Sequence, residues 1–483
     1  MPIPFTNFRH SMMRSIVMEP LTSLVTAPDQ PPNQHFDVIV WLNESFRNGI
    51  AAAADSVHAQ LNALDPGANI LAQYCFARLT ARQILQLAAE TRAQVREGGR
   101  NAAPIYQIWS DTEIRTTLTR SLSTVKADAA QRAFQALGEG IVWAVLDSGI
   151  DATHPHFAEF DNLRIPEPLT HIDFTTNSPS PLTDVPGHGT HVAGIIAGRW
   201  QSPTPGGEPV IGCETRADSP SDSEFHLESL AQISGVAPRC KLLSLKVIGP
   251  EGAGKVSWIL RAIDRIQQWN QYGKRLVIHG ANLSLGYDFD PRWFACGQSP
   301  LCVEVNRLVR SGVSVVVSAG NGGYSSYLTS SGATEERFSD MSITDPGNAE
   351  LAITAGSTHR EMPHTYGVSY FSSRGPTGDG RLKPDLLAPG ERIVSCAAGR
   401  ERDRYAALSS ETARVLYCEQ SGTSMAAPHV SGAIAAFLSV RPEFIGEPER
   451  VKRLFTASTI DLHRHPYFQG AGLIDLMKVL QAI

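Results

Sequence analysis

The stretch Ile141-Val-Trp-Ala-Val-Leu-Asp-Ser-Gly149 is an apolar run that ends in an acidic residue and a turn. A strand without polar alternation is typical of a parallel sheet covered on both faces, because both sides of such a strand are buried. Polar residues that directly follow these strands lie at the carboxyl edge of the sheet, where open α/β folds place their functional groups. Asp147 is therefore the first candidate functional residue.

Outward from this stretch, apolar segments alternate with segments of helical character. The expected strands are 241–247, 276–285, 313–319 and 351–355, and the expected helices are 188–197, 256–272, 302–310 and 424–440. This alternation predicts a parallel sheet with helices on both faces, and we assign residues 116–483 to that α/β domain. Residues 199–228 are rich in Pro, Gly, Ser and acidic side chains, so we expect them to form a surface insertion.

A smaller unit precedes this domain. Residues 36–115 show the order strand, helix, strand, helix, strand, with strands expected at 36–42, 69–79 and 105–109 and the first helix at 49–64. Thr80-Ala-Arg-Gln83 is a capping box that predicts the start of the second helix. We therefore expect a compact α+β domain.

Residues 1–35 are expected to be a flexible tail. Their apolar stretch is broken by Glu19 and Pro20, so it is too short for the apolar core of a signal peptide. This absence of a clear signal peptide favours a cytoplasmic location.

Bulk composition excludes several classes of protein. The chain has 483 residues, of which 42% are apolar and 19% charged, as in a globular protein. A net charge of −6 without blocks of like charge argues against a nucleic-acid partner. No continuous apolar run reaches the length of about 18 residues that a membrane helix needs. The seven cysteines are no disulfide scaffold; Cys296 with Cys302, or Cys396 with Cys418, could be bridged, or all could be free thiols.

Two more polar residues begin expected helices of the larger domain. His188 lies in Gly187-His-Gly-Thr-His-Val-Ala-Gly194, and Ser424 lies in Ser421-Gly-Thr-Ser-Met-Ala-Ala-Pro428. Alone, each candidate has an ordinary structural explanation: a turn aspartate, a structural histidine, a serine N-cap. Together they supply the chemistry of nucleophilic catalysis, in which an imidazole removes the serine proton and a carboxylate orients and stabilises that imidazole.

The three motifs Asp147-Ser-Gly149, His188-Gly-Thr-His-Val-Ala-Gly194 and Gly422-Thr-Ser-Met-Ala426 resemble the signatures of the subtilisin family. They occur in that family's chain order of Asp, His, Ser. The resemblance covers about residues 117–483 and implies a subtilisin-like fold. It also implies a serine endopeptidase that hydrolyses extended polypeptides through an acyl-enzyme intermediate.

The resemblance also assigns further site residues. Asn321, in Ala319-Gly-Asn321, resembles the family's oxyanion asparagine. Ser284, Leu285 and Gly286 resemble the substrate-binding strand beside the first specificity pocket, and Gly252, Ala253 and Gly254 resemble the opposing strand. Thr344 lies near the expected base of that pocket, where an uncharged residue favours apolar or broad specificity over basic specificity.

By its position and order of elements, the N-terminal domain resembles the family's propeptide. The resemblance implies an intramolecular inhibitor and a self-processing zymogen, and Val125-Lys-Ala127 resembles the start of the mature enzyme in relatives. No cofactor is expected to be required. His156 stands where many members have a calcium-binding aspartate, so the motifs do not support the family's strong calcium site, although the acidic residues of 199–228 leave calcium binding possible. His191 and His429 are expected to be packing residues.

Two alternatives use the same motifs. A non-peptidase serine hydrolase of the α/β-hydrolase type would place its acid and histidine after the serine, whereas Asp147 and His188 precede Ser424. A catalytically inactive binding protein on a subtilisin fold would retain the architecture. Such proteins usually lose a member of the triad, and all three members are present here.

Overall fold

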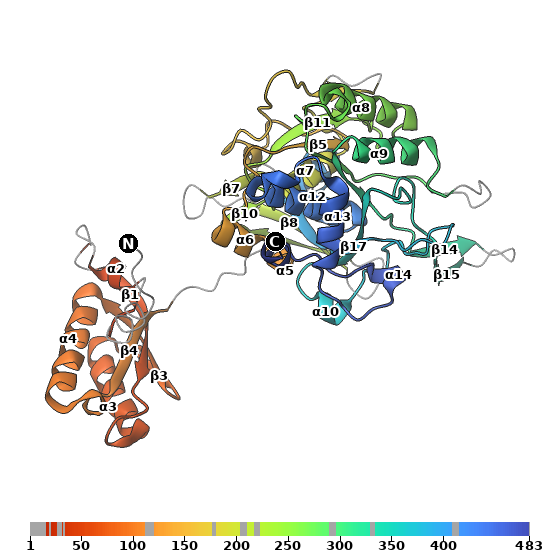
Figure 1. Cartoon of the computed structure of the whole chain (residues 1–483). Coiled ribbons are helices and arrows are strands. Elements are labelled where there is room, and N and C mark those ends of the chain that lie inside the picture. The colour runs from red at the N-terminus through yellow and green to blue at the C-terminus, as the bar shows by residue number, and fades with distance from the viewer. Residues whose placement is uncertain are drawn as a thin grey trace. The chain divides into compact units, whose positions relative to one another are not determined.

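The computed structural model describes residues 16–18, 21–26, 31, 34–111, 120–175, 180–202, 210–216, 223–288, 296–328, 334–407 and 415–482. The chain divides into two compact units, Met1–Thr116 and Thr117–Ile483, each of which is described by itself (Figure 1). This division falls at nearly the same place as the boundary between the two expected domains.

The first unit is a four-stranded antiparallel sheet with two long helices. The sheet has the order β2-β3-β1-β4. Its elements are β1 (His35–Leu42), α3 (Gly49–Leu64), β2 (Asn69–Leu71), β3 (Tyr74–Thr80), α4 (Ala81–Gly98) and β4 (Ile105–Ser110). Alternate residues of β1 are buried with one face of each helix, which gives this unit its own core. The capping box at the start of α4 is confirmed, since Thr80 N donates to Gln83 Oε1 at 2.7 Å.

Two expectations for this unit are wrong. Residues 69–79 form two strands instead of one, because the chain turns at Ala72, which has a φ of 52°. The described residues within 1–35 are also not all a flexible tail. Helix α2 (Leu21–Val25) buries Leu21 and Val25 in the core, and Val17 forms a bridge to Ile108 of β4.

The second unit is built on a seven-stranded parallel sheet of order β17-β16-β13-β12-β5-β11-β6. Its strands are β5 (Val142–Asp147), β6 (Ile172–Asp173), β11 (Lys241–Lys246), β12 (Gly280–Leu283), β13 (Ser314–Ser318), β16 (Ile353–His359) and β17 (Leu386–Glu391). Every neighbouring pair in this sheet is parallel. The expected α/β fold class is thereby confirmed.

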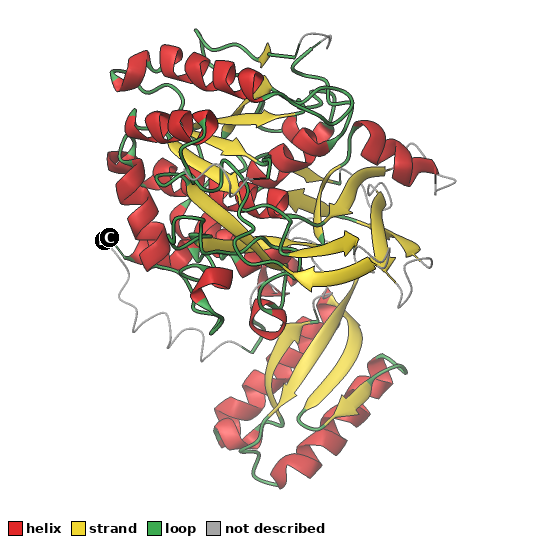
Figure 2. Cartoon of the chain, turned by 90° about the vertical axis from the view of Figure 1, so that its right-hand side faces the viewer, coloured by secondary structure: helices red, strands yellow, loops and turns green. Residues whose placement is uncertain are grey.

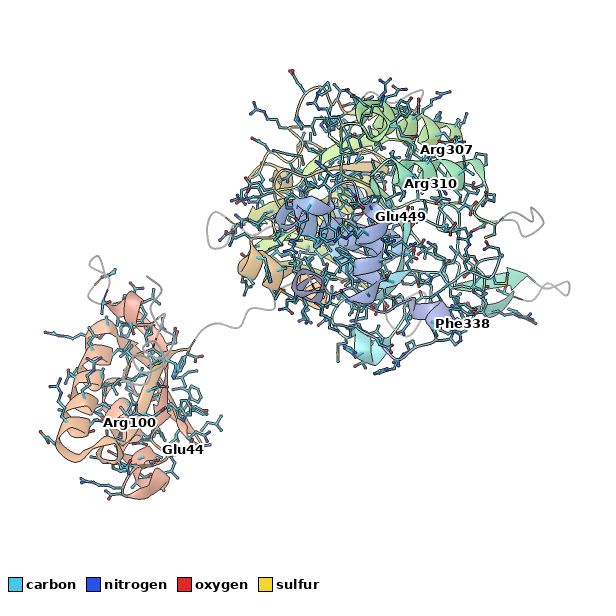
Figure 3. The ribbon with its side chains drawn as sticks, viewed as in Figure 1. Glu44, Arg100, Arg307, Arg310, Phe338 and Glu449 are labelled. Atoms are coloured by element: carbon cyan, nitrogen blue, oxygen red, sulfur yellow. The ribbon has the colours of Figure 1, made fainter. Side chains whose placement is uncertain are left out.

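Both faces of this sheet are covered by helices (Figure 2). Trp143 and Val145 of β5 belong to one buried cluster, and Ala144 and Leu146 to the other, because successive side chains of a strand point to opposite faces. The first cluster includes α7 (His188–Ile196), α12 (Thr423–Val440) and α13 (Pro448–Ala457), and the second includes α8 (Val256–Trp269) and α9 (Pro300–Arg310). Figure 3 shows Arg307 and Arg310 on α9.

Helix α12 lies at the centre of the unit. Among the described helices it alone is long and apolar enough, by length and composition, to cross a membrane. However, 83% of that stretch is buried inside the unit, as in the core helix of a globular domain. The remaining described helices of the second unit are short: α5 (Arg120–Thr124), α6 (Ala127–Phe134), α10 (Pro363–Tyr366), α11 (Gly399–Ala407), α14 (Pro466–Gln469) and α15 (Leu476–Gln481).

Residues 199–228 were expected to form a surface insertion, but their described parts include strands with buried side chains, Ile211 and Cys213. They contain β7 (Arg199–Gln201), β8 (Val210–Arg216) and most of β9 (Ser223–Ser229). β7 pairs with β10 (Gln232–Ser234), whereas β8 and β9 join β18 (Ile393–Cys396) and β19 (Val415–Gln420) in a second sheet. Ile211 of β8 is fully buried, so β8 contributes to the core, whereas Leu227 of β9 is exposed. A further hairpin, β14 (Tyr324–Leu328) and β15 (Thr334–Phe338), follows β13.

Candidate active site

Three candidate residues lie at the ends of elements that the fold brings together. Asp147 is the last residue of β5, His188 is the first residue of α7, and Ser424 is the second residue of α12. Gly187 has a φ of 95°, and a Cβ at this position would lie 2.2 Å from the Ala398 carbonyl oxygen. Only glycine therefore allows the chain to turn sharply into α7 and present His188.

Asp147 and His188 form a direct contact. His188 Nδ1 donates to Asp147 Oδ1 at 2.8 Å. The aspartate side chain is 1% exposed, whereas the histidine side chain is 29% exposed, so one edge of the imidazole faces solvent. Ser148 N also donates to Asp147 Oδ1, at 2.8 Å. These donors fix the carboxylate, and the carboxylate in turn fixes the Nδ1–H tautomer of the ring and leaves Nε2 as the acceptor.

Nearby acidic groups shift the pKa of His188. Burial lowers this pKa, but Asp147, followed by Asp184 and Glu401, raises it by more, so that the net value lies above the ordinary 6.5. The charged imidazolium is thus stabilised relative to the neutral ring. Such a ring is suited to accept a proton and hold it for a short time.

Asn321 Nδ2 and Ser424 N both lie near Gly422. Asn321 Oδ1 accepts hydrogen bonds from Thr423 N at 2.9 Å and Thr423 Oγ1 at 3.0 Å. A Cβ built on Gly422 would lie 3.4 Å from Asn321 Nδ2 and 3.7 Å from Ser424 N. Because Asn321 Oδ1 is engaged by Thr423, its Nδ2 is left for another acceptor. An oxyanion within reach of both Nδ2 and Ser424 N would accept from both donors.

The residues expected to bind substrate follow β12 and β11, the two strands that flank β5 in the parallel sheet. Ser284 directly follows β12, and its Oγ donates to the Ser424 carbonyl oxygen at 2.8 Å, while Ser424 Oγ donates to the Ser284 carbonyl oxygen at 3.2 Å. Ser284, Leu285 and Gly286 are thereby placed beside the candidate nucleophile. Gly252, Ala253 and Gly254 form an exposed turn that follows β11, at the same edge of the sheet, where Gly249 N donates to the Ala253 carbonyl oxygen at 2.8 Å.

Sequence reasoning missed a buried acid behind the histidine. Asp184 Oδ1 accepts from Ser148 Oγ at 2.8 Å and Gly187 N at 2.9 Å, and Oδ2 accepts from Thr190 N at 2.7 Å. Burial raises the pKa of Asp184, although these hydrogen bonds oppose the shift. The carboxylate ties the end of β5 to the loop before α7. The signal was an acid four residues before His188 in an otherwise uncharged motif.

A second missed group holds the start of α12. Asn282 Nδ2 donates to Ser284 Oγ at 2.9 Å, and Ser431 Oγ donates to Asn282 Oδ1 at 2.9 Å. All three side chains are buried. This chain of hydrogen bonds fixes the position of Ser424 through its carbonyl group. In the sequence, Asn282 could have been recognised as a polar residue inside an otherwise apolar strand.

Three further histidines and the cysteines are buried, as expected of residues with a structural role. His191 and His429 are fully buried, and burial lowers their pKa to about 3 and about 4. His156 is equally buried, with a pKa that burial lowers to about 3. All seven cysteines are buried free thiols. The part of the chain that the structure describes contains no group of three or more His, Cys, Asp or Glu placed to hold a metal ion, and the expectation on calcium stays a prediction.

Comparison with known proteins agrees with this geometry. The model of the subtilase family of peptidases matches residues 138–472. The serine protease AprX of Bacillus subtilis is 29% identical over 378 residues, which cover 77% of this chain and 73% of that protein. Subtilisin E of Bacillus subtilis is 28% identical over 369 residues, covering 76% and 73%. An intracellular serine protease of Paenibacillus polymyxa is 27% identical over 378 residues, covering 77% and 90%.

Proposed function

Since this chain belongs to the subtilase family and is a serine-type endopeptidase, we propose that Asp147, His188 and Ser424 form its catalytic triad. The observation that carries the proposal is the 2.8 Å contact between His188 Nδ1 and Asp147 Oδ1. Asn321 Nδ2 and Ser424 N both lie near Gly422, at the start of α12. These groups supply a base, its orienting acid and two donors for an oxyanion.

The first half of the reaction forms an acyl-enzyme. Ser424 Oγ turns from the Ser284 carbonyl toward His188, gives its proton to Nε2 and attacks the carbonyl carbon of the scissile peptide bond. The carbonyl oxygen becomes an oxyanion that accepts from Ser424 N and Asn321 Nδ2. The intermediate collapses as the C–N bond breaks, and His188 donates its proton to the departing amine.

The second half of the reaction restores the enzyme. Water enters, gives a proton to His188 Nε2 and attacks the acyl carbon, and the same two donors stabilise the second oxyanion. The C–O bond to Ser424 then breaks and the proton returns to Oγ. Asp147 remains ionised throughout, because its role is to hold the Nδ1–H tautomer and to stabilise the imidazolium.

The substrate is held as an extended chain. Ser284, Leu285 and Gly286 on one side, and Gly252, Ala253 and Gly254 on the other, follow strands of the same parallel sheet. Main-chain hydrogen bonds to these segments select an extended backbone with little regard to its side chains. This arrangement suits an endopeptidase, which binds residues on both sides of the scissile bond.

We further propose that the first unit is an inhibitory propeptide. Its four-stranded sheet, two helices and separate core are the features of a domain that folds on its own. Its position before the peptidase domain and its order of elements resemble the family's propeptide. On this proposal the chain is a zymogen, and its substrates and its own N-terminal unit compete for the same groove.

A fluorophosphonate test of Ser424 decides the central proposal. The reagent should label the wild-type protein at Ser424, and Ser424→Ala should lose labelling and peptidase activity by about a million-fold, the size known for subtilisin itself. Ser421→Ala is the matched control, because Ser421 is an exposed serine three residues upstream. A folded wild-type protein that is neither labelled nor active would favour the inactive binding protein instead.

A further inference from the structure

The side chain of Thr344 lies between two glycines at the carboxyl edge of the sheet. A Cβ built on Gly286 would lie 2.7 Å from Thr344 Oγ1. A Cβ built on Gly320 would lie 2.8 Å from both Thr344 Oγ1 and Thr344 Cγ2. Both terminal atoms of the threonine therefore occupy the space that separates the two glycine backbones.

This space adjoins the reacting atoms. Gly286 lies two residues after Ser284, whose carbonyl oxygen accepts from Ser424 Oγ at 3.2 Å. Gly320 directly precedes Asn321, and Gly320 N donates to Thr423 Oγ1 at 3.1 Å. The two glycines follow β12 and β13, which are neighbours in the sheet. A substrate residue (P1) whose carbonyl oxygen meets Asn321 Nδ2 and Ser424 N would therefore have its side chain close to these two segments.

Thr344 is held in this position and brings no charge to it. Thr344 N donates to the Ala319 carbonyl oxygen at 3.1 Å, and Thr344 Oγ1 donates to the same oxygen at 3.4 Å. The neighbouring carboxylate, Asp345, is fully buried, and its Oδ1 accepts from Asn348 Nδ2 at 2.8 Å. The Thr344 side chain at this place is thus short and uncharged.

We propose that Thr344 forms a raised floor of the P1 site and restricts this peptidase to substrates with a small P1 side chain, such as alanine or serine. The inference rests on the proposed function, because it needs Ser424 to be the nucleophile. A leucine or phenylalanine at P1 would have to displace a threonine that is hydrogen-bonded to backbone and packed between two backbones. The specificity is narrower than the apolar or broad preference that an uncharged residue at this position suggested.

The test uses the full chain and a series of peptides that differ only at P1, with alanine, leucine, phenylalanine or arginine. For the wild type, kcat/KM should be at least about tenfold higher for alanine than for phenylalanine, since misfit of one methylene in a specificity pocket is worth about 10- to 200-fold. Thr344→Gly should raise kcat/KM for phenylalanine by about tenfold or more, and change the value for alanine less. Thr344→Val keeps the volume without the hydroxyl and should keep the wild-type ranking.

Titration of active sites with a fluorophosphonate separates the two levels of the proposal. A wild type that is labelled and hydrolyses the phenylalanine peptide as well as the alanine peptide overturns the role of Thr344 alone. So does a labelled Thr344→Gly variant with an unchanged ranking. A wild type that is neither labelled nor active overturns the proposed function and this inference together. If Thr344→Gly does not fold, the wild-type ranking and the smaller change Thr344→Ala decide.

Discussion

The backbone N–H of Thr423 donates to Asn321 Oδ1 at 2.9 Å, and the hydroxyl of the same threonine donates to that oxygen at 3.0 Å. One residue of α12 thus fixes the orientation of the Asn321 amide. The carbonyl end is engaged by Thr423, so the NH₂ end is left for another acceptor, which on our proposal is the substrate oxygen. The donor is oriented before any substrate binds, which is the condition under which an oxyanion site is most effective.

Replacement of Asn321 by leucine should lower kcat by about 100- to 1,000-fold, the range known for the corresponding change in subtilisin. KM should change little, because the oxyanion exists only near the transition state. Thr423→Val should cost less, since Thr423 N still holds Asn321 Oδ1. Steady-state kinetics on one peptide measures both variants, and an effect of Asn321→Leu on KM alone would contradict the assigned role.

Asp147→Asn should reduce kcat by roughly 10,000-fold through the wrong histidine tautomer. An asparagine at this place keeps the shape of the side chain but offers an NH₂ group to His188 Nδ1, which then becomes an acceptor and places the ring proton on Nε2. The fold should persist, because the two side chains have nearly the same shape, although Ser148 N, which shares its acceptor with His188 Nδ1, loses that hydrogen bond. Thermal unfolding and kinetics on the same preparation test this, and a folded variant within tenfold of wild type refutes it.

The value of kcat/KM should fall toward acidic pH, and the midpoint of this acid limb should lie above pH 6.5. The pKa of His188 is raised above that value, so the inactive, protonated ring persists to higher pH, and activity increases as pH rises through the pKa. Glu401 is one of the groups that raise this pKa, after Asp147 and Asp184. Glu401→Gln should therefore move the limb to lower pH. Asp403→Asn, on the same helix, is the matched control and should leave the limb in place.

Much of this fold is predictable from local sequence. The uninterrupted apolar run that ends at Asp147 indicates a central parallel strand, and the capping box at Thr80 and Gln83 fixes the start of α4 at the observed residue. The three motifs lead to residues that the structure places at adjoining ends of strands and helices. These signals act over a few residues, so they can be read without knowledge of the tertiary fold.

The parts that could not be predicted depend on distant partners. β8 lies in a segment rich in turn-forming residues; it pairs along its length with the nearby β9 and joins the core sheet by pairing with β19, about 200 residues later in the chain. Leu21 becomes buried only because α2 packs on the core of the first unit. The surroundings of Thr344 likewise depend on Gly286 and Gly320, which follow two different strands and pack against it.

The last prediction concerns the removal of the first unit. β4 ends at Ser110 and α5 begins at Arg120, and of the segment between them residues 112–119 lie outside the described residues. The chain from α5 onward belongs to the second unit. Arg120 forms an ion pair with Glu361, Val125 is fully buried, and Leu476 N donates to the Val125 carbonyl oxygen at 3.0 Å. A cut that spares both folded units must therefore fall between the end of β4 at Ser110 and the start of α5 at Arg120.

We expect Ser424 to make this cut on its own chain. A tethered segment reaches an effective concentration of roughly the millimolar range, so the reaction should be independent of protein concentration. Mass spectrometry should find the new N-terminus in wild-type protein and an intact chain in Ser424→Ala. Mixing Ser424→Ala with active wild type tests cleavage between molecules, and a rate that falls on dilution would show that mode instead. A full-length wild type that hydrolyses peptides at an undiminished rate would show that the first unit is no inhibitory propeptide, because an uncut inhibitor must occupy the groove that the peptide needs.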